Sequence, residues 1–193
     1  YCAFYSRPPE PGLVAAWFAG IERELAALPA GFAPESAFFG GGTPTALEES
    51  ELARLIDLVR ARVDFKNLAE WTCEANPGTL TPAKLARLKN GGVNRLSIGA
   101  QSFDDATLRR LGRIHAAGET AAAVALARAA GFGNIGLDLI YGVPGVAFES
   151  FCADVEAALA LAPEHVSCYC LAIEDGTPFA REAAAGRLAV SEE

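Results

Sequence analysis

Each strand-like segment of the chain is followed by at least one helical segment. The strand-like segments are short apolar runs that end in turn residues, and they span 36–45, 68–78, 93–103, 134–145 and 165–178. The helical segments repeat apolar residues at helical spacing, and they span 13–29, 47–63, 81–92, 104–115, 118–132, 148–163 and 179–188. This order predicts an α/β fold with a parallel sheet, because a helix between two strands brings the second strand back parallel to the first.

Polar or glycine-rich groups close the strand-like segments. They are Gly41-Gly42-Thr43, Glu74, Gln101, Asp138 and the residues from Tyr169 to Glu174. In a parallel barrel the carboxyl ends of the strands form one rim, so one polar group per βα unit would line a single site. An open doubly wound sheet fits the same alternation, but it brings fewer such groups together, mostly near its switch point. The distribution therefore favours a barrel.

The composition limits the classes of partner. The 193 residues are 51% hydrophobic and carry a formal net charge of −8, which suits one globular domain and argues against a nucleic-acid partner. No apolar run is long enough to span a membrane and no signal peptide is visible, so we expect a cytoplasmic protein without a transmembrane segment. The absence of methionine indicates a fragment of a longer polypeptide.

A glycine-rich loop, GGGTPT, occupies residues 40–45. Its three glycines allow the backbone to approach a ligand closely and to point N–H groups at a carboxylate, a phosphate or an amino-acid moiety. The loop is not a P-loop, since no GK[ST] follows, and it lacks the GxGxxG spacing of a dinucleotide fold. A tight turn from strand to helix accounts for the same glycines equally well.

Three side chains at strand ends are further candidates for ligand binding. Glu74 could accept hydrogen bonds from an amine or a ribose, but taken alone it is more readily a solvated turn residue. Gln101 and Asp138 are more informative, because Asp138 lies inside an otherwise apolar strand, where a carboxylate is costly unless it is paired or binds a ligand. An internal partner such as Arg113 would also satisfy Asp138, so structural and functional roles both stay open.

The histidines and cysteines form no clear metal or nucleophile motif. His115 and His165 have no cysteine or acidic residue at zinc-ligand spacing, so we expect structural or surface roles for both. Cys168 and Cys170 face the same side of their strand, and we expect them to be small buried side chains rather than a metal pair. The five scattered cysteines do not resemble a disulfide framework.

Five longer motifs occur in the same order in one known family. They are FFGGGTPTAL, EANPGTL, GVNRLSIGAQSFDDATLRRLGRIH, NIGLDLIYGVPG and CLAIEDGTPFA. On these motifs, almost the whole chain resembles radical S-adenosylmethionine (SAM) proteins of the oxygen-independent coproporphyrinogen III oxidase family. The resemblance implies a partial parallel (β/α)6 TIM-like barrel whose first strand lies outside the fragment. It also implies that residues 1–193 are an incomplete radical SAM core domain, without the C-terminal domain.

The same resemblance gives a role to the first two residues. Members of the family carry a CxxxCxxC motif after the first barrel strand, and Tyr1-Cys2 looks like its end, which makes Cys2 the third ligand of a [4Fe-4S] cluster. The other two cysteines would lie upstream, because Cys2 alone cannot hold a cluster stably. SAM would bind the open iron, and an electron donor protein would reduce the cluster.

Most of the SAM-binding positions of the family fall on the strand ends described above. Tyr1 would pack near the cluster and the adenine, and Cys170 would lie close to the adenosine through its backbone. Gly41, Gly42 and Thr43 would bind the amino end of the methionine moiety. The remaining positions, some of which serve a second SAM in the oxidase branch, are Glu74, Gln101, Arg113 and Asp138.

Two branches of the family differ just after the third cluster cysteine. Gly-Cys follows it in the oxidase branch, whereas Ala3 and Phe4 follow Cys2 here, which resembles the heme chaperone branch. We therefore expect a protein that binds heme and transfers it to an acceptor protein, with the heme-binding signature lying beyond Glu193. The alternatives are an oxidase that converts coproporphyrinogen III to protoporphyrinogen IX, and a barrel that binds another anionic small molecule without iron.

Overall fold

The computed structural model describes residue 1 and residues 10–188, and within them strands and helices alternate as the sequence predicts. The strands are β1 (Ser36–Phe39), β2 (Glu70–Ala75), β3 (Arg95–Gln101), β4 (Ile135–Tyr141) and β5 (His165–Cys170). The helices are α1 (Pro11–Ala26), α2 (Glu49–Arg60), α3 (Pro82–Gly91), α4 (Asp105–Arg110), α5 (Ala117–Ala129), α6 (Phe148–Ala160) and α7 (Pro178–Ala184). Three short 3-10 helices, which the sequence pattern does not predict, lie in loops at Pro44–Ala46, Phe65–Asn67 and Pro77–Thr79.

The five strands form one parallel sheet in the order β1-β2-β3-β4-β5. Each strand therefore lies beside the next one in the chain, without the reversal of strand order that defines a doubly wound sheet. This winding confirms the TIM-like prediction. Within the described residues β1 and β5 do not pair, so the barrel is partial and stays open between these two strands.

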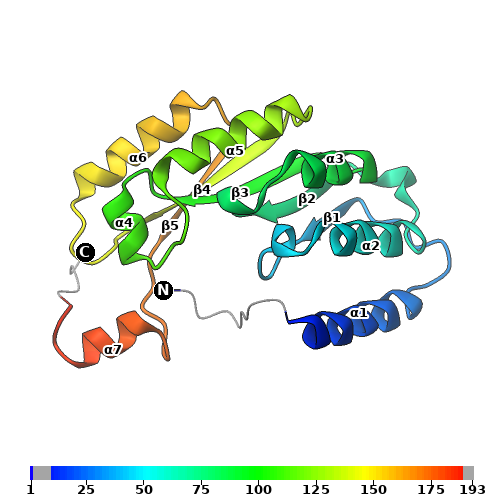
Figure 1. Cartoon of the computed structure of the whole chain (residues 1–193), viewed down its shortest axis with the longest axis horizontal. Helices are drawn as coiled ribbons and strands as arrows, with labels where there is room; N and C mark the ends of the chain where they lie inside the picture. The colour runs from blue at the N-terminus through cyan, green and yellow to red at the C-terminus, as the bar shows by residue number, and fades with distance from the viewer. Residues whose placement is uncertain (2–9, 189–193) are drawn as a thin grey trace.

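The main core lies between the sheet and the helices on its outer face. Figure 1 shows α3, α5 and α6 over one side of the sheet. Alternate residues of the central strands point toward these helices and are fully buried, among them Trp71, Cys73, Leu96, Ile98, Leu137 and Leu139. Burial of each such leucine or isoleucine stabilises the folded state by about 1.5–3 kcal/mol.

None of the helices in the described part of the chain is long and apolar enough to cross a membrane.

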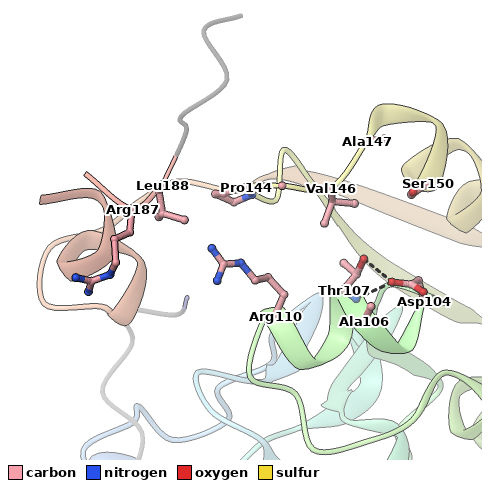
Figure 2. Close-up of a pocket in the computed structure, with 11 residues that line it drawn as sticks. Asp104, Ala106, Thr107, Arg110, Pro144, Val146, Ala147, Ser150, Arg187 and Leu188 are labelled. Carbon is pink, nitrogen blue, oxygen red and sulfur yellow. Dashed lines mark hydrogen bonds between the residues drawn. The ribbon is translucent and has the colours of Figure 1, made fainter. Parts of the chain in front are cut away.

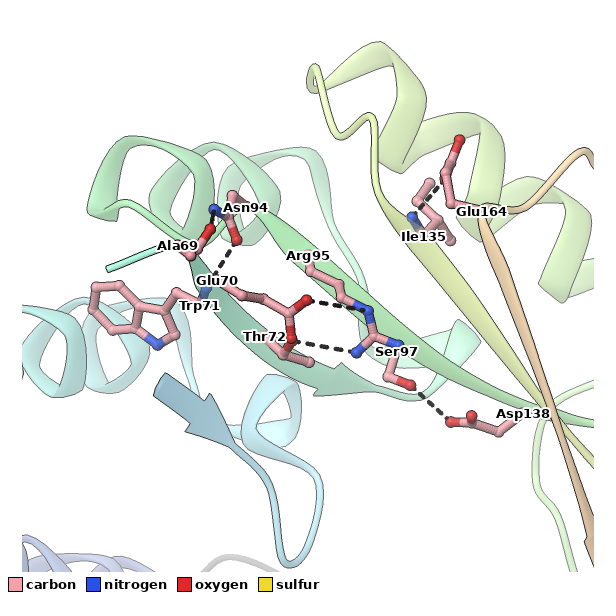
Figure 3. A network of polar contacts seen from close by, with 10 residues as sticks. All are labelled: Ala69, Glu70, Trp71, Thr72, Asn94, Arg95, Ser97, Ile135, Asp138 and Glu164. Carbon is pink, nitrogen blue, oxygen red and sulfur yellow. Dashed lines mark hydrogen bonds and ion pairs between the residues drawn. The ribbon is translucent and has the colours of Figure 1, made fainter. Parts of the chain in front are cut away.

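The inner face of the sheet, which points away from these helices, is polar. Glu70, Thr72 and Glu74 alternate on β2 with the buried core residues, and Arg95 and Ser97 do the same on β3. Figure 3 shows how these side chains link neighbouring strands: the Arg95 guanidinium donates to Thr72 Oγ1 (3.2 Å) and lies 4.0 Å from a Glu70 carboxylate oxygen. The inner face therefore offers hydrogen-bonding groups instead of an apolar core.

Local signals account for the ends of α3, which leads into the central strand β3. The Lys84 amide donates to the side chain of Thr81 (3.2 Å), and Pro82 occupies the first helical position. Gly92 ends the helix with a φ of 108°, a left-handed conformation that glycine adopts readily. The helix predicted at 81–92 is thereby confirmed.

The last helix, α7, does not pack beside α6. Phe179 of α7 instead joins Leu111, Ile140 and Val143 in a second small core near the carboxyl ends of the strands, and Figure 1 shows α7 on the opposite side of β5 from α6. β5 is one of the two edge strands of the described sheet. Consequently Cys168 and Cys170 are exposed, and the expectation that both would be buried is wrong.

Candidate functional site

The glycine-rich loop after β1 lies directly against the end of β2. The amide of Gly41 donates a hydrogen bond to Glu74 Oε2 (3.2 Å). A Cβ atom added to the preceding residue, Gly40, would clash with the Phe38 ring and lie only 2.8 Å from the same carboxylate oxygen, so both side chains would have to move to make room for it. Gly41 has a φ of 92°, which also favours glycine. In this structure the glycines therefore allow a close approach between the loop after β1 and the end of β2, whereas their predicted contact with a ligand stays a prediction. Gly42 is exposed, and no described side chain contacts it through a hydrogen bond.

Asn76 connects three of the predicted site segments. Its Nδ2 donates to Thr43 Oγ1 (2.8 Å), and its Oδ1 accepts from Arg113 Nη2. Sequence reasoning missed Asn76, because the segment EANPG reads first as a turn. The available signal was the position of Asn76, which lies between the strand-end carboxylate of Glu74 and Pro77.

Arg113 is held above the end of β3 by several acceptors. Besides Asn76, its Nη2 donates to the Gly99 carbonyl (3.0 Å), and its Nη1 lies 3.4 Å from the Tyr1 hydroxyl. Tyr1 also packs against the second small core. Tyr1 and Arg113, which are far apart in the sequence, thus lie close together beside the end of β3, and their contact with SAM stays a prediction.

Gln101 combines burial with an unusual backbone. Its φ is 65°, the pairing of β3 with β4 shifts register between Gly99 and Gln101, and the Ser102 amide donates back to the Ala100 carbonyl (2.8 Å). A left-handed residue other than glycine costs roughly 1–3 kcal/mol, and such residues concentrate at functional sites. Gln101 is only 9% exposed, and its amide has no hydrogen-bond partner among the described residues. This amide is therefore available to a ligand.

Asp138 lies on the inner face of β4, and its structural partner is not Arg113. The hydroxyl of Ser97 donates to Asp138 Oδ2 (3.0 Å), as Figure 3 shows. Within the described residues no ion pair joins Asp138 to Arg113, because the guanidinium bonds Asn76 and Gly99 instead. The partner suggested by the sequence is thus wrong. The second carboxylate oxygen stays available for a ligand.

Two carboxylates influence one another across the inner face. Burial raises the pKa of Glu74, the Gly41 amide opposes that rise, and repulsion by Asp138 adds to it. A cationic or hydroxyl-bearing ligand between the two would relieve this cost. The rim therefore favours a ligand that brings a positive charge or several hydroxyl donors.

The remaining candidates lie apart or cannot be placed. Cys170 is exposed at the end of β5 and lies beside Tyr141, the last residue of β4, and Gly142, which follows it, without a hydrogen bond to the rim residues named above. Cys2 lies outside the described residues. Among the residues that are described, no three His, Cys, Asp or Glu side chains come close enough to hold a metal ion. Burial raises the pKa of Cys73 to about 12, so its thiol stays protonated at neutral pH.

Two cavities adjoin this end of the fold. One of about 270 Å3 is lined in part by Asn76 and Arg113, together with His115, which is buried with Nε2 3.2 Å from the Ala100 carbonyl. A larger one of about 590 Å3 lies between α4, the loop before α6 and the residues after α7, and Arg110 extends toward it (Figure 2). The larger cavity contains none of the site residues predicted from the sequence.

Comparison with known proteins gives the site its family context. Residues 1–158 match the radical SAM superfamily. The chain is 41% identical over 145 residues to the heme chaperone HemW of Haemophilus influenzae, covering 75% of this chain and 38% of the relative. It is 37% identical over 199 residues to the heme chaperone HemW of Mycobacterium tuberculosis H37Rv, covering 100% of this chain and 51% of the relative. The chain thus spans about half, or less, of the length of these relatives.

A solved structure agrees with these matches. Coproporphyrinogen III oxidase (HemN) of Escherichia coli, described as a radical SAM enzyme, superimposes with a TM-score of 0.76 over 90% of this chain and 45% of that protein, at 29% identity. The same fold, with a parallel sheet, is therefore shared with a protein of known structure. The chain belongs to the radical SAM superfamily, for which a [4Fe-4S] cluster and SAM are the implied cofactors.

Proposed function

We propose that this chain is the core of a heme chaperone that carries a [4Fe-4S] cluster and SAM, binds heme, and transfers heme to an acceptor protein. The observation that carries the proposal is the 37% and 41% identity to proteins named heme chaperone HemW. The Cys2-Ala3-Phe4 sequence, which resembles the chaperone branch, supports the same choice. The heme-binding part and the acceptor protein belong to the proposal, since the chain spans about half of these relatives.

The polar groups of the rim residues match those of SAM. SAM presents an ammonium, a carboxylate, two ribose hydroxyls and a flat adenine. Glu74 and Asp138 would accept from the ammonium or the hydroxyls, and the buried, unpartnered amide of Gln101 would bond a polar group of the ligand. The loop of Gly41, Gly42 and Thr43 would bind the amino end of the methionine moiety. Arg113 would contribute a further SAM contact, Tyr1 would pack near the cluster and the adenine, and Cys170 would lie close to the adenosine.

The cluster itself would rest on Cys2 and on two cysteines upstream of Tyr1, since the described residues offer no group of ligands. When bound, the cluster supplies single electrons for cleavage of the SAM sulfonium, with an electron donor protein as their source. The role of this chain's own residues is to orient SAM at the rim. Packing of Tyr1 against Leu111, Ile140, Val143 and Phe179 would keep water from that end of the site.

One alternative has an observation of its own. The 29% identity and TM-score of 0.76 to coproporphyrinogen III oxidase favour an enzyme that decarboxylates coproporphyrinogen III oxidatively to protoporphyrinogen IX. The two functions share the cluster and SAM and differ in what happens to the tetrapyrrole. A chaperone binds heme and passes it on unchanged, whereas the oxidase consumes a porphyrinogen.

The test uses the polypeptide extended upstream of Tyr1 and through the C-terminal domain, reconstituted with iron and sulfide without oxygen. SAM binding, heme binding, heme transfer to an apoprotein and porphyrinogen consumption are measured side by side. We expect SAM binding, stable heme binding and transfer, and no porphyrinogen consumption. Turnover of coproporphyrinogen III without heme transfer would replace the chaperone by the oxidase.

A matched pair of variants connects the result to the rim. Glu74→Gln, at the carboxyl end of β2, should weaken SAM binding, whereas Glu70→Gln, on the same face at the amino end of β2, should leave it unchanged. Equal effects of the two variants would place the SAM site elsewhere.

A further inference from the structure

A buried carboxylate on α6 bonds the two residues that follow Gln101. Asp154 is 5% exposed, its Oδ2 accepts from the Ser102 hydroxyl (2.7 Å), and its Oδ1 accepts from the Phe103 amide (2.6 Å). The Ser102 hydroxyl oxygen in turn accepts from the Asp104 amide (3.0 Å). Asp154 thus fixes a backbone segment that lies about fifty residues earlier in the chain.

That segment begins at the strained residue of the rim. Gln101 has a φ of 65°, and the Ser102 amide closes a three-residue turn on the Ala100 carbonyl (2.8 Å). A backbone in this region persists only where its surroundings determine it from several sides. The hydrogen bonds from Asp154 hold the residues just after the turn, so Gln101 cannot relax into an ordinary extended conformation without breaking them.

The free-energy cost of burying the Asp154 carboxylate indicates that this side chain does more than fill space. Burial raises the pKa of Asp154, and the Ser102 and Phe103 donors offset that rise only in part. No cation forms an ion pair with Asp154 among the described residues. An apolar side chain would fill this position on a helix that packs against the sheet without such a penalty.

We propose that Asp154 is a positioning residue for the SAM site: it holds Ser102 and Phe103 so that Gln101 keeps its left-handed backbone and presents its amide to the ligand. The inference rests on the proposed function, because it takes Gln101 as a contact of SAM. Asp154 itself does not reach the ligand and acts only through Gln101.

A double-mutant cycle tests this in the extended, reconstituted polypeptide. Loss of one ligand hydrogen bond predicts about tenfold weaker SAM binding for Gln101→Ala, and loss of its orientation predicts about fivefold for Asp154→Ala. The double variant should bind SAM as weakly as Gln101→Ala alone, because both changes remove the same contact. Asp154→Asn keeps an acceptor for the Phe103 amide and should restore most of the affinity.

A control separates this role from general loss of stability. Glu164 accepts a hydrogen bond from the Ile135 amide (2.7 Å) at the amino end of β4, so Glu164→Ala removes a comparable carboxylate–amide contact far from the rim. It should leave SAM affinity unchanged. Hydrogen exchange at the Phe103 amide, measured without SAM, should be at least about tenfold faster in Asp154→Ala than in the unmodified protein.

Each departure from this pattern decides between the proposals. If Gln101→Ala binds SAM normally, both the role of Gln101 and the inference about Asp154 fall. If Gln101→Ala weakens binding but the effect of Asp154→Ala is absent or simply adds to it, the proposed function stands and the positioning role is overturned. Should Asp154→Ala fail to fold, Ser102→Ala removes one of the two bonds and must show the same non-additivity with Gln101→Ala.

Discussion

The substitution Gly99→Ala tests the packing of the rim most sharply. Gly99 is a buried residue of β3, and a Cβ atom placed there would meet Gln101 Nε2 at 2.6 Å, with Arg113 Nη2 and Asn76 Oδ1 both at 3.2 Å. Ordinary contacts of a Cβ begin near 3.4 Å, so the Gln101 amide must retreat by about 1 Å. One methyl group thus displaces three polar side chains of the candidate site at once.

The magnitudes follow from which atoms must move. All three are ends of side chains, so the cost in stability should lie near the lower limit of overpacking, about 1 kcal/mol. For a chain of this size that corresponds to a fall in melting temperature of about 2–4 °C. Displacement of binding groups by about 1 Å weakens ligand binding far more than it lowers stability. We therefore expect SAM affinity to fall by between about tenfold and about a hundredfold.

The assay compares Gly99→Ala with Gly136→Ala in the extended, reconstituted polypeptide. Gly136 lies on the neighbouring strand β4, where a Cβ would meet Arg95 Nη2 at 3.0 Å and none of the three rim side chains. Equilibrium dialysis with SAM and thermal unfolding followed by circular dichroism are measured for both variants. If Gly99→Ala binds SAM as tightly as the unmodified protein, the convergence of these side chains does not build the SAM site.

Three further predictions concern single residues. Burial, with repulsion by Asp138, raises the pKa of Glu74, so the free energy of unfolding should fall as pH rises through the mildly acidic range above the ordinary pKa of a glutamate. Urea denaturation should show a flatter profile for Glu74→Gln, and identical profiles would contradict this. Arg113→Ala removes the donor to the Gly99 carbonyl and should lower the free energy of unfolding by about 2–3 kcal/mol, with partial recovery in Arg113→Lys, which can replace only one bond. Thr81→Ala should lower the free energy of unfolding by about 1 kcal/mol, because it removes the α3 cap, and should leave SAM affinity unchanged. A loss of SAM affinity in this variant would show that lower stability by itself weakens binding.

The fold was largely predictable because its signals are local. Alternation of short apolar runs with helical runs determines a parallel sheet, and the positions of Thr81, Pro82 and Gly92 define one helix almost to the residue. The polar groups at strand ends predicted one rim, and the hydrogen bond between Gly41 and Glu74 and the repulsion between Glu74 and Asp138 agree with it. Each of these inferences needs only residues close in sequence or a general property of parallel strands.

The misses all depend on which side chains meet across the sheet. Asp138 was given a partner of opposite charge, Arg113, yet a hydroxyl on the adjacent strand, Ser97, lies closer in the actual register. Asn76 and Asp154 bond residues more than thirty positions away, and nothing in the neighbouring sequence reveals those partners. Cys168 lies beside Leu139 in register, on the helix-bearing face, but at the edge strand its burial cannot be read from its apolar character.

The central claim is that this rim binds SAM beside a [4Fe-4S] cluster held in part by Cys2. It is tested most directly by the iron and acid-labile sulfide content of the anaerobically reconstituted polypeptide extended upstream of Tyr1, compared with its Cys2→Ala variant. The account predicts about four irons and four sulfides per chain, and a variant that retains neither. An iron-free parent protein, or a Cys2→Ala variant with undiminished iron, would contradict it.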